Sequence, residues 1–333
     1  MFKYLGNIFE NHLFQASMAL AGFGGLLSDA YLGMYGFWIT LFIALALLSW
    51  SVIDEYRMRK FYTNEVLPIP IVISVDDPKP LNAIYLSITK EIEKDKRFKD
   101  IEKKLNRYFN ISRNDLLFQY NGSMYDNKRL ISFLQIIRYS LNAIERCFDN
   151  KVQFHIAYLK RPAIGFAIGS MFRSDGIVVY QNNDFQDRFD RVATISSRQY
   201  KEQITEYKKF SLVKNISNPQ SKSLLLVIQL SSHNVSYDHD TFKDFENKVI
   251  LKSLGNGTIG MNEDWVLYAQ EIYNTINNLH LEYSDITIAH SMPEAVAIIV
   301  GMALENYWNI NITQFDQGDY KTVINLQSIH YYF

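Results

Sequence analysis

The sequence predicts an α/β protein in which two half-domains of similar topology follow a helical hairpin in a membrane. Three observations predict it. The eighteen residues from Gly36 to Ile53 carry no charge, a run long enough and apolar enough to cross a bilayer. Beyond this run, strand and helix patterns alternate, which is typical of a sheet covered by helices. The order of these patterns then recurs in the second half of the chain.

The uncharged run has tryptophans near both ends, Trp38 and Trp50. Roughly 20 apolar residues cross the hydrocarbon core, and tryptophan favours the membrane interfaces. A buried core helix is the alternative, although uncharged helices of this length with Trp at both ends are uncommon in soluble folds. Arg57, Arg59 and Lys60 follow directly and predict that the chain beyond residue 55 lies in the cytoplasm, with the N-terminus on the same side.

A second apolar segment, residues 13–27, precedes the first, and we expect a tight turn at residues 28–29. Ser17, Ala21 and Gly25 lie four apart on one helical face, and small residues at this spacing let helices approach closely in lipid. They are candidates for membrane packing, either between hairpins or within one. A cleaved signal peptide is the alternative, but Lys3 alone makes a poor basic region. Residues 1–56 are therefore predicted to form a transmembrane hairpin.

The charge balance and the single cysteine indicate a cytosolic domain without an extended nucleic-acid partner. Lys and Arg number 34 and Asp and Glu 35, so the chain does not predict binding of duplex nucleic acid. A small anionic ligand remains compatible with this balance, because the charge of one pocket does not show in the total. Cys147 cannot form an internal disulfide, and its place on an apolar helix face predicts a buried, inert thiol.

The first predicted half begins after a polar connector, residues 57–66. Residues 69–75 are rich in β-branched side chains and predict a strand. Charges at most positions of 86–107, with apolar residues among them, predict a solvated surface helix. A short strand at 116–120 is closed by an Asn-Gly turn.

The rest of the first half repeats the alternation of helix and strand. Apolar residues of 130–148 recur at helical spacing and predict an amphipathic helix. A strand at 152–159, a helix of small residues at 163–172 and a strand at 177–181 follow.

The second half shows the same order. A buried strand at 223–230 ends in Ser-Ser-His-Asn, and a helical apolar stripe covers 269–279. The remaining predicted elements are a strand at 285–289, a helix of small residues at 294–304, and strands at 310–314 and 320–326.

Two segments of the halves align directly. Residues 154–169 placed over 286–301 match strand to strand, proline-containing loop to loop and helix to helix, with Gly169 opposite Gly301. The alignment predicts a duplication with half-domains at about 67–200 and 201–333.

The loops at the start of the two aligned helices are candidate ligand sites. Open α/β sheets bind ligands beyond the carboxyl ends of their strands, where helix N-termini offer free N–H groups. Arg161 and Lys160 are able to hold a phosphate, although a solvated Lys-Arg pair is the alternative. The candidate donors are Tyr158, Lys160 and Arg161 in the first loop, and His290 and Ser291 in the second.

No catalytic motif stands out. His233, His239 and Asp240 suggest a zinc cluster, but no cysteine joins them and the segment reads as a loop. The glycine-rich phosphate loops, the zinc-protease motif and the hydrolase serine motif are all missing from the sequence. We therefore expect neither an enzyme nor a metal or cofactor site.

The C-terminal segment resembles a known family. His-Ser-Met-Pro-Glu-Ala-Val-Ala at 290–297, continuing to Gly301, the strand ending in Gln314-Phe315, and Tyr320 at the start of the last strand resemble the end of SAVED domains. These domains are cyclic-oligonucleotide sensors of bacterial anti-phage signalling (CBASS), and the resemblance covers about residues 67–333. Two fused Rossmann-like (CARF-like) halves behind two membrane helices resemble the 2TM-SAVED effectors of these systems.

The resemblance implies a ligand and an output. A partner nucleotidyltransferase would make a cyclic di- or trinucleotide, and the SAVED domain would bind it between its halves. Sensor domains would then form an oligomer, and the clustered hairpins would disrupt the inner membrane and cause abortive infection. A membrane-anchored hydrolase of the signalling nucleotide, or a tethered protein-interaction scaffold, are the alternatives.

The resemblance also implies a set of ligand contacts. Aromatic side chains such as Tyr158 or Phe315 would stack on bases, unless they are core aromatics. The implied residues are Ser74, Asp76, Tyr158, Lys160 and Arg161 in the first half, and Ser231, His233, Asn234, His290, Ser291, Met292, Gln314 and Phe315 in the second.

Overall fold

The computed structural model describes residues 12–19, 25–75, 80–148, 151–172, 176–183, 188–196, 198–255, 257–305 and 307–329. They fall into two compact units. The first unit comprises Met1–Leu67, Asp100–Ser112 and Glu145–Lys151, and the second comprises Pro68–Lys99, Arg113–Ile144 and Val152–Phe333.

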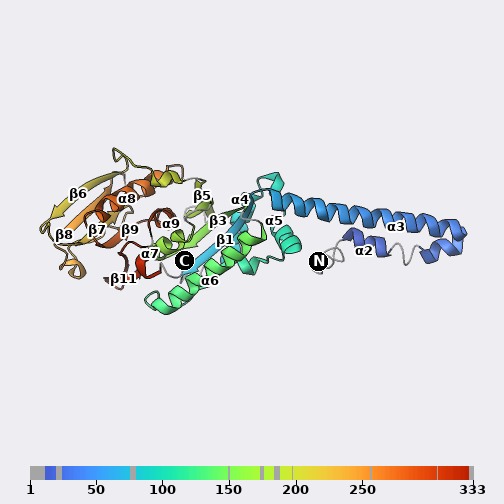
Figure 1. The fold of residues 1–333 in the computed structure, drawn as a ribbon, viewed down its shortest axis with the longest axis horizontal. Helices are drawn as coiled ribbons and strands as arrows, with labels where there is room; N and C mark the ends of the chain where they lie inside the picture. Colours follow the sequence, from blue (N-terminus) through green and yellow to red (C-terminus); the bar gives the residue numbers. More distant parts are fainter. Residues whose placement is uncertain are drawn as a thin grey trace. The chain divides into compact units, whose positions relative to one another are not determined.

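A single long helix dominates the first unit. α3 (Gly25–Asn64) has 40 residues, which at about 1.5 Å per residue is roughly twice the hydrocarbon thickness. Within the described residues, only its segment Trp38–Met58 is long and apolar enough to cross a membrane. α2 (His12–Ala19), which packs against α3, has eight described residues (Figure 1). The structure therefore supports one candidate span, and the predicted second span is not confirmed.

Two predicted boundaries in this region are wrong. Residues 28–29 lie inside α3 and form no turn. A serine and an aspartate near a helix N-terminus are well tolerated, because the dipole there favours an acid. The predicted connector at 57–66 is likewise helical as far as Asn64. Its Arg, Met and Lys residues are good helix formers, and the first proline comes only at Pro68.

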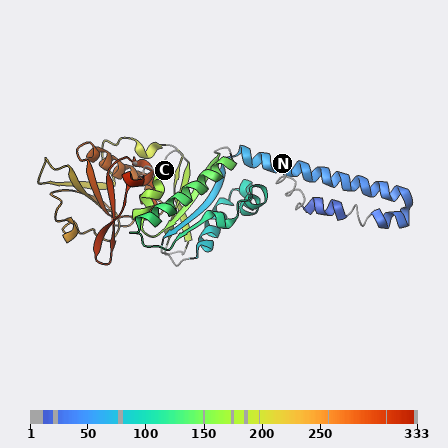
Figure 2. The ribbon, with the colours of Figure 1, turned by 60° about the horizontal axis from the view of Figure 1, so that its bottom comes forward.

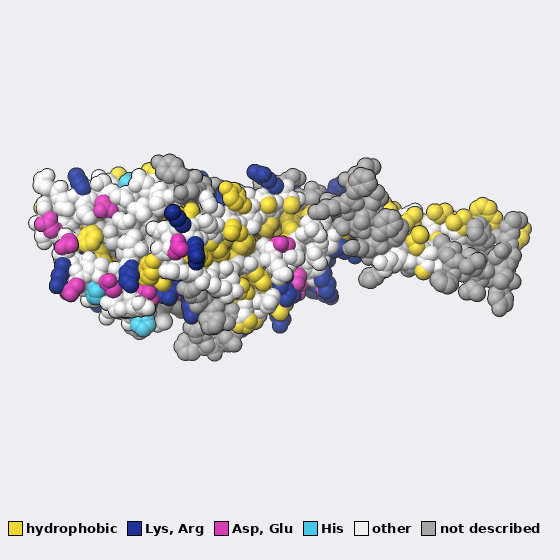
Figure 3. All heavy atoms as spheres, turned by 90° about the horizontal axis from the view of Figure 1, so that it is seen from below, with side chains coloured by type: hydrophobic (Ala, Val, Ile, Leu, Met, Phe, Trp, Pro, Cys, Tyr) yellow, Lys and Arg dark blue, Asp and Glu magenta, His cyan; other side chains and the backbone are white. Residues whose placement is uncertain are grey.

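The candidate span is mostly exposed in this structure. Only 17% of Trp38–Met58 is buried, and large apolar side chains along it are exposed, among them Trp38, Phe42, Trp50 and Ile53. Figure 3 shows hydrophobic side chains gathered along α3. Water does not stabilise such a surface, whereas lipid does.

The opposite side of α3 carries buried polar groups. Ser51 and Glu55 are fully buried, and Arg107 places Nη2 3.4 Å from Glu55 Oε2. Of the predicted packing residues, Ser17 in α2 is buried, Gly25 is the first residue of α3, and Ala21 lies outside the described residues. Their role in packing between hairpins stays a prediction.

The predicted surface helix at 86–107 is divided into short pieces. α4 (Leu81–Ile92) is followed by η2 (Lys96–Phe98), α5 (Ile101–Lys104) and the π-helical η3 (Leu105–Phe109). Asp95 accepts a hydrogen bond from the Arg97 backbone N–H, and Asp100 takes a left-handed conformation with φ of 56°. The side-chain cap of Asp95 and the left-handed backbone of Asp100 both interrupt a continuous helix.

The first sheet contains mostly parallel strands. Its order is β2-β1-β3-β4-β5, and only β5 runs antiparallel to its described neighbour. η4 (Arg113–Leu116) precedes β2, and η5 (Arg198–Lys201) follows the sheet. The strands are β1 (Leu67–Val75), β2 (Leu117–Tyr120), β3 (Val152–Leu159), β4 (Ile177–Asn183) and β5 (Arg188–Ile195), with helices α6 (Asn127–Cys147) and α7 (Pro162–Ser170).

The second sheet follows the same scheme. Its order is β11-β10-β9-β7-β8-β6, with a parallel centre and antiparallel strands at both edges. The helices are η6 (Asp240–Phe242), α8 (Trp265–His280), α9 (Glu294–Ala303) and α10 (Leu326–Ile329). The strands are β6 (Phe210–Ile216), β7 (Ser223–Gln229), β8 (Asn247–Ser253), β9 (Asp285–Ser291), β10 (Ile310–Asp316) and β11 (Asp319–Asn325).

The helices that follow β3 and β9, α7 and α9, cross each other at small residues (Figure 1). A Cβ added at Gly169 would collide with the Ile298 carbonyl, and one added at Gly301 with the Phe166 carbonyl. In the sequence alignment of the halves, Gly169 corresponds to Gly301 and Phe166 to Ile298. The contact is therefore reciprocal, as expected for two copies of one unit that pack about a local two-fold axis.

Candidate ligand-binding site

A pocket of about 660 Å³ opens at the carboxyl ends of β7 and β9, beside the β10–β11 hairpin. Pockets that hold drug-sized ligands have volumes of roughly 300–1,000 Å³. All but one of its lining residues come from the second half. They are Pro162, Ser231, Ser232, His233, Asn234, Val235, Ser236, His239, His290, Ser291, Met292, Gln314, Phe315, Gly318 and Tyr320.

Backbone hydrogen bonds fix the loop that forms one wall of the pocket. The carbonyl of Ser291 accepts from the backbone N–H groups of both Leu230 and Ser231, at 2.9 and 3.0 Å. Farther along, Gln229 donates its side-chain amide to the Val235 carbonyl at 3.1 Å. The loop that follows β7 is thus tied to the end of β9, so its polar side chains have a defined position.

A buried, unpartnered histidine faces this pocket. His290 is 7% exposed, and neither ring nitrogen has a hydrogen-bond partner among the described residues. Burial lowers the pKa of His290 to about 4, so the ring is neutral at pH 7 and presents one donor and one acceptor. Ser291 Oγ is buried and equally without a partner in the described part of the chain. Phe166 packs against the imidazole, with ring centroids 5.4 Å apart.

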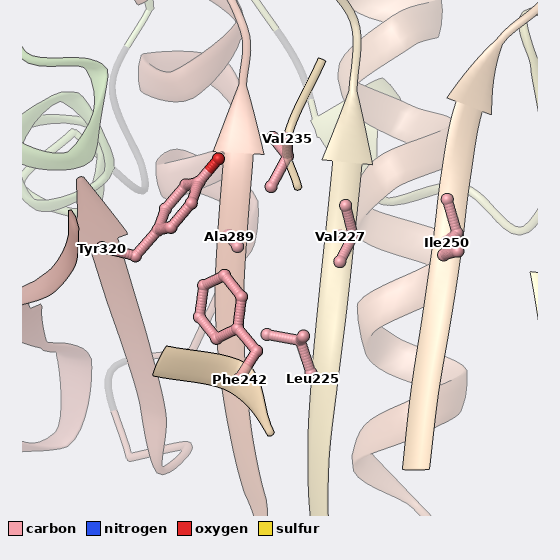
Figure 4. Packing of buried hydrophobic residues seen from close by; sticks show 7 residues of the cluster. All are labelled: Leu225, Val227, Val235, Phe242, Ile250, Ala289 and Tyr320. Atoms are coloured by element: carbon pink, nitrogen blue, oxygen red, sulfur yellow. The ribbon is translucent and has the colours of Figure 1, made fainter. Parts of the chain in front are cut away.

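Aromatic side chains form another wall. Phe315 is half-exposed, and its ring lies 4.9 Å from that of Tyr320. The Tyr320 hydroxyl accepts from the Ser236 N–H at 3.2 Å. Figure 4 shows Tyr320 and Val235 as part of the hydrophobic cluster that supports this side of the pocket. The cluster consists of Leu225, Val227, Val235, Phe242, Ile250, Ala289 and Tyr320.

The β10–β11 hairpin, red in Figure 2, is held at its tip by the segment around His239. His239 Nε2 lies 3.0 Å from the Gly318 carbonyl oxygen, and Thr241 Oγ1 donates to the carboxylate of Asp319. Gln317 and Gly318 both have positive φ, which forms the tight turn.

The first half contacts the same hairpin. Arg161 Nη1 lies 3.5 Å from Asp316 Oδ1, and the Ala163 N–H points to Gln314 Oε1 at the same distance. Both distances are at the long limit for hydrogen bonds. Tyr125 also faces Asp316, and its pKa is raised to about 12, first by burial and then by the negative charge of Asp316.

The described lining of the pocket contains no Lys, Arg, Asp or Glu, and its buried histidine is neutral. Neutral donors and acceptors with aromatic rings suit a heterocyclic base better than a bare anion. Arg161 does not line the pocket, but it directly precedes the lining residue Pro162, and its Nη1 lies 3.5 Å from Asp316, which follows the lining residue Phe315.

The structure brings together every candidate that the sequence placed in the second half. These eight residues, Ser231, His233, Asn234, His290, Ser291, Met292, Gln314 and Phe315, all line the pocket. They lie at or just beyond the carboxyl ends of β7, β9 and β10, where open α/β sheets bind ligands. Their contact with a ligand stays a prediction.

The described first-half candidates do not line this pocket, so among the described residues Pro162 alone meets the expectation of a site shared between the halves. Ser74 is fully buried in β1, and Asp76 lies outside the described residues. Tyr158 is 2% exposed and donates its hydroxyl to the Arg161 carbonyl, so it is a core aromatic rather than a stacking surface. Lys160 and Arg161 take left-handed conformations, with φ of 58° and 64°.

Sequence reasoning missed the remainder of the wall. Val235 and Ser236 extend the polar loop beyond Asn234, and Gly318 belongs to a turn that we did not predict. His239 lines the pocket as a hydrogen-bonded side chain. Among the described residues, no group of three His, Cys, Asp or Glu side chains is placed to hold a metal.

Comparisons with known proteins agree with this architecture. Residues 161–326, close to half of the chain, match the family model described as "SMODS-associated and fused to various effectors sensor domain" (SAVED). No curated protein is significantly similar.

Solved receptor structures share the fold. The Acinetobacter baumannii Cap4 SAVED/CARF-domain containing receptor with the cyclic trinucleotide 3′3′3′-cAAA matches with a TM-score of 0.52 and 13% identity over 85% of this chain. The same receptor with 2′3′3′-cAAA gives 0.53 and 14% over 85%. The Moraxella osloensis Cap4 receptor gives 0.52 and 12% over 87%. Our chain spans about 60% of the length of these receptors.

Proposed function

Since this chain carries a SAVED sensor domain, we propose that its pocket binds a cyclic di- or trinucleotide. Every lining residue of the pocket falls within the segment that matches the family model. The Acinetobacter baumannii receptor of the same fold holds a cyclic trinucleotide. The half-domains, in this proposal, divide near residue 200, between β5 and β6.

The unpartnered His290 carries the proposal. A buried polar group without a hydrogen bond costs roughly 1–3 kcal/mol, so a ligand that pairs with it recovers this free energy on binding. The neutral imidazole offers a donor and an acceptor to the edge of a base, and Phe315 offers an exposed ring for stacking.

Calorimetry with the full-length protein and a panel of cyclic di- and trinucleotides, including 3′3′3′-cAAA, tests this proposal. We expect at least one member to bind, and His290→Ala to weaken that binding about tenfold or more, as loss of a buried pairing predicts. His280→Ala is the matched control, because His280 stacks on Trp308 and does not line the pocket. Failure of the whole panel to bind would reject the receptor function.

We propose that the output of this receptor is physical rather than catalytic. α3 would anchor it in the bacterial inner membrane with the sensor in the cytosol, and a partner nucleotidyltransferase would supply the ligand. Bound sensors would assemble, raise the local concentration of their membrane helices and disrupt the bilayer, as in CBASS-type abortive infection. The exposed apolar side chains of Trp38–Met58 support the anchor.

Dye-filled anionic vesicles that contain the full-length protein test the output. We expect dye release only after the bound nucleotide is added, together with a shift to larger species in size analysis. His290→Ala should release no dye at the same concentration. Nucleotide recovered intact supports a receptor, whereas hydrolysis products would favour the anchored hydrolase.

A further inference from the structure

The proposed ligand and the pocket differ in charge. A cyclic oligonucleotide carries a negative charge on each phosphate, yet the described lining of the pocket has no basic side chain. A phosphate must therefore find its counter-charge at the rim.

Arg161 supplies the rim with an incompletely used guanidinium. It directly precedes Pro162, which lines the pocket, and its Nε is buried without a hydrogen-bond partner in the described structure. Its Nη1 reaches Asp316 only at 3.5 Å. A guanidinium has five donors in a fixed fork that matches two phosphate oxygens, so this single long contact leaves most of its capacity open.

Asp316 occupies the place of an anion beside this guanidinium. Its side chain is 22% exposed, it follows the lining residue Phe315, and it lies on the β10–β11 hairpin. The Asp316 carboxylate reaches Arg161 only at 3.5 Å and also faces the half-buried Tyr125, so its contact with the guanidinium is not a strong one. It is a weak partner that a doubly contacting phosphate is able to replace.

We infer that Asp316 competes with a ligand phosphate for Arg161, so that the Arg161–Asp316 pair screens ligands by charge. The inference rests on the proposed cyclic-oligonucleotide function. A phosphate that wins Arg161 releases Asp316, and with it one of the contacts that the first half makes to the hairpin. A neutral nucleoside leaves the pair intact, because it offers the guanidinium no anion.

The test measures binding of two probes to the full-length protein by calorimetry: 3′3′3′-cAAA, or whichever panel member binds best, and adenosine as a neutral probe. Asp316→Asn should tighten binding of the cyclic nucleotide about two- to fivefold, the range expected for a partly exposed ion pair. It should leave adenosine binding unchanged. Arg161→Ala should weaken the cyclic nucleotide and abolish the gain from Asp316→Asn.

Asp240→Asn is the matched control. It removes the same charge from the same half, but Asp240 pairs with Lys243 and its side chain is 84% exposed. If Asp240→Asn tightens binding as much as Asp316→Asn does, the gain is a general effect of charge and the specific competition for Arg161 is rejected. Thermal melts check that each variant is folded. If Asp316→Asn is not folded, the binding measurement is repeated with Asp316→Ser.

The outcomes separate the two proposals. If the wild type binds the cyclic nucleotide and both Asp316 variants bind it equally or less tightly, the competition is overturned. The receptor function then still stands. The same holds if the gain persists in the Arg161→Ala background. No binding of any panel member overturns the receptor function, and the competition with it.

Discussion

The ring of Phe315 is an exposed aromatic surface in the pocket wall on which a ligand base is able to stack. Phe315 is half-exposed although it is large and apolar, and its ring lies tilted against that of Tyr320, at 54°. Stacking of a base on an aromatic ring contributes roughly 1–3 kcal/mol.

Replacing Phe315 with alanine should therefore weaken nucleotide binding about 5- to 150-fold, while Phe315→Trp keeps it. The melting temperature should change little, because the ring is half-exposed. Tyr307→Ala is the control, since Tyr307 is a comparably exposed aromatic outside the pocket. Equal affinities for Phe315→Ala and the wild type would exclude stacking on this ring.

His290 also makes folding stability depend on pH. Its pKa is about 4 in the folded protein against an ordinary value of 6.5, so between these values the unfolded chain binds the extra proton. Stability is then fully present above pH 6.5 and is lost as the pH falls toward 4.

Denaturant unfolding at several pH values should show this loss, and His290→Asn should flatten the curve in the same window. His155, whose pKa burial also lowers to about 4, remains in that variant and keeps part of the slope. An unchanged slope in His290→Asn would mean that His290 is not buried in solution.

Local sequence was enough to place some polar side chains in the pocket wall, but not their closest neighbours. His290 and Ser291 were predictable because they lie at the carboxyl end of a clear strand, where ligand sites of such sheets occur. His239 and Gly318 meet only through the folded hairpin, so no local pattern reveals them. Cys147 was predicted to be buried and is exposed, because it lies beside the apolar stripe of α6, of which Ile144 and Phe148 are the buried members at this end.

At the scale of elements, the central strands β7 and β9 were predicted, whereas β5, β6 and β8 were not. β7 is a buried apolar run, and β9 is buried over its five central residues. β6 is exposed over most of its length and shows no alternation of apolar and polar residues. Lysines flank the short apolar run of β8, so it does not read as a buried strand. β6 and β8 are therefore strands because they form hydrogen bonds with their neighbours in the sheet, and their local sequence does not predict them.

The crossing of α7 and α9 gives a sharp prediction about packing. Gly169→Ala and Gly301→Ala should each lower the free energy of unfolding by about 1–3 kcal/mol, because each Cβ meets a backbone carbonyl that is unable to retreat. Denaturant titration measures the change. The double variant should lose less than the sum, since one separation of the helices relieves both collisions.

Gly176→Ala serves as the control for this pair. The nearest atom to an added Cβ there is 3.6 Å away, an ordinary contact, so stability should change little. If the control loses as much as Gly169→Ala, the crossing is not the cause.

For the whole molecule, the membrane assignment depends on the surroundings of α3. Ala46 is exposed on the surface of this helix, so a cysteine in its place would react with a polar thiol reagent if the helix were in water. In a bilayer the same position lies within the apolar span and is shielded.

Single cysteines placed in a Cys147→Ser background test this in vesicles. With a membrane-impermeant maleimide, Ala46→Cys should stay unlabelled until detergent is added, whereas Lys60→Cys should be labelled at once. The wild-type protein, which keeps Cys147, is the positive control, because this cysteine is exposed. Rapid labelling of Ala46→Cys in intact vesicles would contradict a membrane-spanning α3.

The reciprocal glycine contact also limits which substitutions the crossing of α7 and α9 tolerates. Each helix leaves the room that the main chain of the other helix fills. A larger residue at either glycine therefore forces the two helices apart. No change of side chain in the opposite helix relieves the collision, because the atom that the new side chain meets belongs to the backbone.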